Sequence, residues 1–156
     1  MARTQTLVRK PKTAAPTIGK VARSKITQAN YEALADFRFA LRNFLAFSER
    51  AAKGAGLTAQ QHQALLTIKA ASAEDAVSIQ HLSTRLLIQH NTAVELVDRL
   101  VEAGLVKRMR DDDDKRRARL ELTTAAERVL ESLSAAHLQE LQAVRPVMLN
   151  LLRQLA

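Results

Sequence analysis

The stretch from Gly104 to Thr123 constrains the fold of this 156-residue chain more than any other segment. Apolar and polar residues alternate on both sides of a turn made of four consecutive Asp residues, at positions 111–114. Val106 and Leu120 lie on the two alternating runs, and this two-residue period predicts a β-hairpin. Two strands alone are only marginally stable in water, so the hairpin must pack against a body that other segments supply.

The rest of the chain has helical spacing. Thr58–Gln61 and Thr124–Glu127 have the pattern of capping boxes, and Ser78 is a further N-cap. Pro146 fits the first turn of a helix but not its middle, so it predicts a break near residue 145. The expected helices are 27–53, 58–71, 79–86, 91–103, 123–145 and 146–155.

The net charge of +8 lies almost entirely in residues 1–25, which carry seven basic side chains and no acidic one. The body is near neutral, with 17 basic and 16 acidic side chains, so total charge does not identify a nucleic-acid binder. Within the body, seven Lys or Arg cluster between positions 107 and 119. We interpret residues 1–26 as a flexible basic arm, which either solubilises the chain or adds nonspecific affinity for phosphates.

The absence of Cys excludes disulfides, thiolate metal sites and thiol-based redox sensing. No apolar run approaches the roughly 20 residues that span a bilayer. Residues 1–25 lack the apolar centre of a signal peptide. We therefore expect a cytoplasmic protein without a membrane partner.

The sequence disfavours an enzyme. Each of the four Gly residues is assigned to the arm, a turn or a helix end, and none forms a phosphate-binding loop or a Gly-x-Ser-x-Gly motif. The four His residues, which are scattered and lack the spacing of a zinc-binding helix, are His62, His81, His90 and His137. We expect no catalytic site, no cofactor and no metal.

Two short helices joined by a tight turn and followed by a hairpin form a winged helix-turn-helix, so the expected fold is mainly α with a two-stranded β wing. Residues 57–123 would form this DNA-binding unit within a domain of residues 27–156. The second short helix would enter the major groove of double-stranded DNA with its first residues against base edges. These candidate base contacts are His90, Asn91, Thr92 and Val94.

Some of these residues have alternative roles. Asn91 is also a favoured helix N-cap, and Thr92 with Glu95 fits a capping box. Arg99 either contacts a phosphate or forms an ion pair with Glu95, four residues earlier on the helix.

The flanking helices, in residues 27–56 and 124–156, are expected to bury apolar surface against a second copy of the chain. Phe39 and Phe47 lie off the main apolar stripe of the first helix, so more than one of its faces is apolar. The alternative is a single wide buried face. The same helix holds all five aromatic residues of the chain, which are Tyr31, Phe37, Phe39, Phe44 and Phe47.

The central sequence resembles the MarR family of bacterial transcriptional regulators. The run Leu96–Val106 matches the family's recognition helix and its Leu-x-x-x-Gly-Leu-Val step. Asp114-Lys115-Arg116 matches the Asp-x-Arg motif of the wing, Leu122-Thr123 the start of the next helix, and Gly56-Leu57-Thr58 the start of the second helix. The resemblance covers roughly residues 30–155.

The resemblance implies a homodimer on a pseudo-palindromic operator with half-sites about one helical turn apart. Arg116 would enter the minor groove, and Asp114 would shape the wing by pairing with a basic neighbour, although such an exposed pair is worth little energetically. Two departures from the family pattern are Ala126, where Gly is frequent, and Glu95, where Arg or Lys is frequent. The further candidate DNA contacts are Ser78, Gln80, Arg99, Arg110, Lys115 and Arg117.

The resemblance also implies a small-molecule ligand, frequently an aromatic or phenolic anion, bound between the dimerisation helices and the DNA-binding unit. Ordinary packing is the alternative role for the candidate pocket residues Arg38, Arg42, Phe44, Ser48 and His62. The expected function is therefore a sequence-specific transcriptional repressor that a ligand releases from DNA. The alternative is a dimeric winged-helix module that binds protein without operator specificity.

Overall fold

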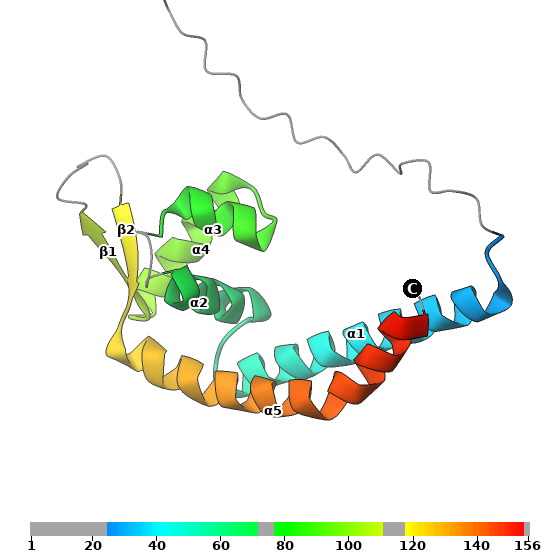
Figure 1. Cartoon of the computed structure of the whole chain (residues 1–156). Coiled ribbons are helices and arrows are strands. Elements are labelled where there is room, and N and C mark those ends of the chain that lie inside the picture. The colour runs from blue at the N-terminus through cyan, green and yellow to red at the C-terminus, as the bar shows by residue number, and fades with distance from the viewer. Residues whose placement is uncertain (1–24, 72–76, 111–117, 155–156) are drawn as a thin grey trace, which may run out of the picture.

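A computed structural model describes residues 25–71, 77–110 and 118–154. Two long helices, α1 and α5, pack along each other, and the remaining elements form a smaller unit near one end of this pair (Figure 1). The winged helix-turn-helix expected from the sequence is confirmed. The elements are α1 (Gln28–Gly54), α2 (Ala59–Ala71), α3 (Ile79–Leu86), α4 (His90–Glu102), β1 (Val106–Arg110), β2 (Ala118–Leu122) and α5 (Thr124–Gln154).

Helix α1 begins and ends through local signals. Thr27 and Asn30 form a reciprocal capping box, in which each side-chain oxygen accepts a hydrogen bond from the other residue's backbone N–H. At the other end, Gly56 has φ of +77°, which allows the chain to reverse into α2. None of the helices in the described ranges is both long and apolar enough to cross a membrane.

The caps of α2 and α3 agree with the sequence. Thr58 and Gln61 form the expected capping box, with N···O distances of 2.9 and 3.1 Å. The hydroxyl of Ser78 accepts a hydrogen bond from the backbone N–H of His81.

The start of α4 differs from both capping predictions, which place the cap at Asn91 or Thr92. Its N-cap is Gln89, which makes no side-chain cap hydrogen bond. Asn91 and Thr92 lie inside the helix, so the capping roles considered for them are wrong. Their side chains therefore do not satisfy the first backbone N–H groups of the helix. The end of α4 agrees with the sequence, since Gly104 has the left-handed φ of +67°.

The hairpin packs on the helices as expected. Val106 pairs with Leu122 and Arg108 with Leu120 in an antiparallel register. Val106 and Leu120 are buried and belong to the same core as apolar residues of α2, α3 and α4. The backbone N–H of Leu120 also donates to the carbonyl of Val77, which ties β2 to the start of α3.

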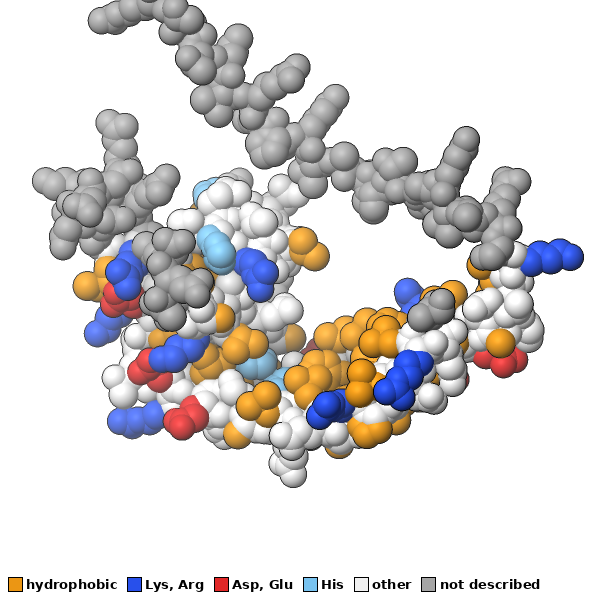
Figure 2. Space-filling model, in the orientation of Figure 1, with side chains coloured by type: hydrophobic (Ala, Val, Ile, Leu, Met, Phe, Trp, Pro, Cys, Tyr) orange, Lys and Arg blue, Asp and Glu red, His pale blue; other side chains and the backbone are white. Residues whose placement is uncertain are grey.

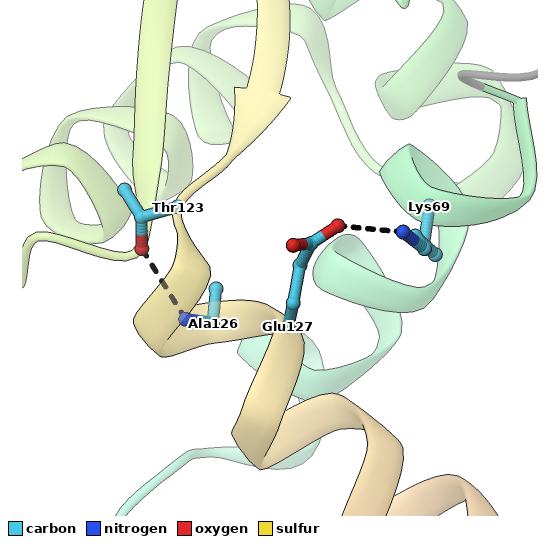
Figure 3. Close-up of polar contacts among 4 residues, drawn as sticks. All are labelled: Lys69, Thr123, Ala126 and Glu127. Carbon is cyan, nitrogen blue, oxygen red and sulfur yellow. Dashed lines mark hydrogen bonds and ion pairs between the residues drawn. The ribbon is translucent and has the colours of Figure 1, made fainter.

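Helix α5 begins one residue away from the expected cap. Thr123, rather than Thr124, is the N-cap, because its Oγ1 accepts a hydrogen bond from the backbone N–H of Ala126 at 3.2 Å (Figure 3). Glu127 does not complete a capping box and instead forms an ion pair with Lys69 of α2 at 2.6 Å. The expected box of Thr124 and Glu127 is therefore wrong, and Glu127 connects α5 to the winged unit.

The expected break at Pro146 is also wrong, since α5 continues through it to Gln154. Proline lacks a backbone N–H, so the carbonyl of Gln142 loses its helical donor while the helix continues. Figure 1 shows α5 bending over its later turns, which is the ordinary effect of an internal proline.

Candidate DNA-binding surface and ligand pocket

The face of α4 that points away from the core carries the candidate base contacts. Ala93, Leu96, Val97 and Leu100 are buried in the winged unit. His90 and Asn91 are exposed at the start of the helix, whereas Thr92 and Val94 are half-buried. The first turn of α4 therefore presents polar side chains to solvent at the end that a recognition helix directs toward DNA.

Glu95 and Arg99 form an ion pair on the same helix, with 3.4 Å between the guanidinium and the carboxylate. The structure thus contains the ion pair considered for Arg99. Both side chains are more than 60% exposed, so the pair is weak and can be exchanged for other partners. Arg99 also offsets the negative charge of Glu95 on a surface that is expected to meet phosphates.

Helix α3 lies beside α4 and holds two more candidates. The hydroxyl of Ser78 accepts the cap hydrogen bond, and its own proton remains able to donate. The side chain of Gln80 is exposed, while its carbonyl accepts from the hydroxyls of Ser83 and Thr84. Leu87, in the turn before α4, has φ of +56° and is 93% exposed.

Most of the candidate DNA contacts in the wing fall in a part of the chain that the structure does not describe. Asp114, Lys115, Arg116 and Arg117 lie outside the described residues, as does the side chain of Arg110. The described part of the wing nevertheless contains an ion pair that sequence reasoning missed.

This missed ion pair joins Arg108 of β1 to Asp98 of α4, at 2.6 Å. It connects the wing directly to the recognition helix. The alternation of the strand places Arg108 on the same side as the buried Val106, but no local pattern identifies Asp98 as its partner.

A pocket of about 600 Å³ lies where α2 meets α1 and α5. Phe44, Ser48 and His62 line it, as considered from the sequence, whereas Arg38 and Arg42 are exposed and are not among its lining residues. The volume lies within the range of small-molecule sites. The other residues that line the pocket are Leu45, Glu49, Ala59, Gln63, Leu66, Ser134, His137, Leu138 and Leu141.

His137 connects the two long helices at the wall of this pocket. Its Nδ1 lies 2.6 Å from the carbonyl oxygen of Leu133, which can only accept, so Nδ1 carries a proton. Its Nε2 lies 2.8 Å from Oγ of Ser48 on α1, and in the neutral imidazole this hydroxyl donates to the ring. The edges and faces of Phe44 and Phe47 surround the ring, at centroid distances of 6.0 and 5.4 Å.

His62 is the second imidazole of the pocket. It is buried, its ring centroid lies 4.7 Å from that of His137, and its Nε2 has no hydrogen-bond partner. Burial, followed by the proximity of His137, lowers the pKa of His62 from its ordinary value. His62 is therefore neutral at neutral pH. Sequence reasoning missed the proximity of the two rings, because 75 positions separate them in the chain.

The two imidazoles do not form part of a larger ligand set. Across residues 25–71, 77–110 and 118–154, no group of three or more His, Asp or Glu side chains is arranged to hold a metal ion. Both nitrogens of His137 are already engaged by protein groups.

The MarR family model matches residues 55–117, from the turn after α1 through the recognition helix into the wing. Over these 63 of its 156 residues, the chain is similar to the MarR family. This similarity supports a DNA-binding transcriptional regulator. Among curated proteins, no sequence matches it significantly.

Solved structures of MarR-family regulators share the fold. MepR, a transcription regulator of the Staphylococcus aureus multidrug efflux pump MepA, is 20% identical with a TM-score of 0.65, over 74% of this chain and 82% of MepR. A MarR family protein from Bacillus stearothermophilus is 26% identical with a TM-score of 0.61, over 74% of this chain and 77% of that one. NadR in complex with 4-hydroxyphenylacetate is 23% identical with a TM-score of 0.62, over 81% and 84% of the two chains.

One departure from the MarR-family pattern has a clear structural basis. Ala126, where Gly is frequent, lies in the first turn of α5 and is fully buried. Its backbone is helical, so no glycine is required there, and its N–H donates to the cap residue Thr123. Glu95, the other departure, is paired with Arg99.

Proposed function

We propose that this chain is a homodimeric repressor of a pseudo-palindromic operator, and that a small molecule bound in the α1–α2–α5 pocket releases it from DNA. The observation that carries this proposal is the position of the pocket. It is lined by the long helices on one side and by α2 of the winged unit on the other. A ligand there can favour one angle between these two parts over another.

Homodimerisation is supported by apolar surface on the long helices. Figure 2 shows hydrophobic side chains gathered over α1 and the later part of α5. A patch of this kind is typical of a subunit interface. The exposed apolar residues are Tyr31, Leu34, Phe39, Leu41, Leu45, Leu138, Leu141, Val147, Leu149 and Leu152.

Operator binding is supported by the arrangement of α4 and the wing. His90 and Asn91 at the start of α4 would face base edges, with Thr92 and Val94 beside them. Ser78, Gln80 and the basic residues of the wing would contact the backbone and the minor groove. The MepR structures include complexes with DNA, which is the behaviour proposed for this chain.

Ligand release is supported by the pocket and by NadR, whose structure holds 4-hydroxyphenylacetate. We place the ligand against Phe44, Ser48 and His62 of this chain. His137 joins them as a pocket residue, because it contacts both Ser48 and His62.

The test is DNA binding by fluorescence anisotropy, with the duplex upstream of the chain's own gene and a random duplex of equal length. We expect nanomolar affinity for the upstream duplex and a steep loss of affinity with salt. Arg116→Ala should weaken specific binding by about 1–3 kcal/mol. Arg128→Ala removes the same charge from the exposed start of α5 and should have little effect.

Two outcomes would contradict the proposal. Equal affinity for both duplexes at moderate salt would favour the alternative of a protein-binding module. A monomer at micromolar concentration in sedimentation analysis would remove the second half-site reader that a palindrome requires.

A further inference from the structure

The charged side chains that line the pocket restrict the charge of the ligand that it can bind. Phe44, Leu66 and Leu138 give it apolar walls on three different helices. Among the described residues that line it, Glu49 is the one carboxylate, and none is Lys or Arg. The pocket therefore offers a negative side chain and no permanent positive one.

The two imidazoles of the pocket carry no permanent positive charge. His62 is buried and neutral, and a second charged ring 4.7 Å from it would repel its protonation further. His137 has both ring nitrogens satisfied in its neutral form, by Leu133 and Ser48. An aromatic carboxylate would lose its hydration in this pocket without gaining a Lys or Arg partner.

Glu49 favours the opposite charge. It lies one residue after Ser48 on α1, and its side chain is exposed where it lines the pocket. An amphiphilic aromatic cation can place its rings against Phe44 and Leu66 and its charged end near this carboxylate. The rings of Phe44 and His137, which pack edge to face at the wall of the pocket, offer aromatic surface to such a ligand.

We propose that the pocket binds aromatic amines in their cationic form and discriminates against aromatic carboxylates of the same skeleton. This inference deepens the proposed function, since it concerns the ligand of the same pocket. It distinguishes this chain from NadR, whose structure holds the carboxylate 4-hydroxyphenylacetate. It also replaces the anion that the family resemblance implies.

The experiment is isothermal titration calorimetry of the full chain, without DNA, against three probes that share one ring system. They are 1-naphthylmethylamine, 1-naphthalenemethanol and 1-naphthoic acid, which are cationic, neutral and anionic at neutral pH. We expect the amine to bind most tightly, the alcohol next and the acid most weakly. The acid should bind at least about tenfold more weakly than the amine, which corresponds to roughly 1.4 kcal/mol.

Three variants locate the effect. Glu49→Gln should weaken amine binding about threefold to tenfold and leave the alcohol unchanged, as expected for one partly exposed charge pair. Glu32→Gln, on the same helix but away from the pocket, should change neither. Ala59→Trp, at the exposed start of α2, should fill the pocket and abolish binding of all three probes.

Tighter binding of the acid than of the amine, or no binding of any probe at millimolar concentration, would overturn the inference. If the preference for the amine is unchanged in Glu49→Gln, Glu49 is not its cause. Operator binding is measured separately by anisotropy. An amine that binds the pocket but does not release the operator would therefore contradict the proposed release, while the ligand preference would stand.

Discussion

Substituting Thr123 tests how the winged unit is joined to α5. Its Oγ1 accepts from the backbone N–H of Ala126 at 3.2 Å and donates to the carbonyl of Gly104 at 2.8 Å. Thr123→Val keeps the shape of the side chain but removes both hydrogen bonds. Losing the cap costs about 1 kcal/mol, and losing the second bond costs about as much again. We therefore expect the free energy of unfolding to fall by about 2 kcal/mol.

The assay is urea unfolding followed by circular dichroism, with all variants at the same protein concentration because subunit association affects apparent stability. For a chain of this length, the loss corresponds to a fall in melting temperature of about 4–8 °C. Thr123→Ser keeps the hydroxyl and should stay within about 0.5 kcal/mol of the original chain.

Thr124→Val is the matched control, since Thr124 is exposed and the sequence alone favours it as the cap. It should change the stability by less than about 0.5 kcal/mol. If Thr124→Val is as destabilising as Thr123→Val, the reasoning from the two hydrogen bonds is refuted.

Three further results are expected. Leu87→Asn should raise the free energy of unfolding by about 0.5–1 kcal/mol in urea, because Asn tolerates φ of +56° better than Leu, whereas Leu87→Ala keeps the strain and should gain nothing. The pKa of His62 is lower in the folded chain than in the unfolded chain. Below about pH 6.5, the unfolded chain therefore binds a proton at His62 more readily than the folded chain does. Stability should therefore fall as the pH of the urea titrations is lowered from about 7 to about 5, and this fall should be smaller in His62→Gln; equal slopes would contradict it. Pro146→Ala restores a donor for Gln142 and should raise the melting temperature, with a gain of up to about 3 kcal/mol; a decrease would show that the bend is required for packing.

The sequence predicts the elements whose signals are local. The alternation around the acidic turn identifies the wing, and the box at Thr58, the cap at Ser78 and the glycine at position 104 fix helix ends within one or two residues. At the start of α5, two adjacent threonines compete, and the contact between Thr123 and Gly104, 19 positions earlier, decides between them. A prediction that considers only neighbouring residues in the sequence does not include that contact.

The pocket is harder to predict, because its residues come from three helices. Phe44, Ser48 and His62 are proposed from the family resemblance, together with Arg38 and Arg42, which do not line the pocket. His137 could not be proposed in this way, since its role depends on the packing of α5 against α1, which brings it to Ser48. The same packing outweighs the helix-breaking tendency of Pro146, since most helical stability comes from tertiary contacts rather than from propensity.

The two connections to the winged unit have a mechanical consequence. β2 is joined to α5 through Thr123 alone, and α1 to α2 through residues 55–58. The part of α5 before Pro146 is about 33 Å long, so a rotation of about 5° about the bend displaces the start of the helix by about 3 Å. The wing, attached at that start, moves with it. The long helix thus acts as a lever arm, which converts a small change of packing at the bend into a displacement about as large as the spacing between successive base pairs.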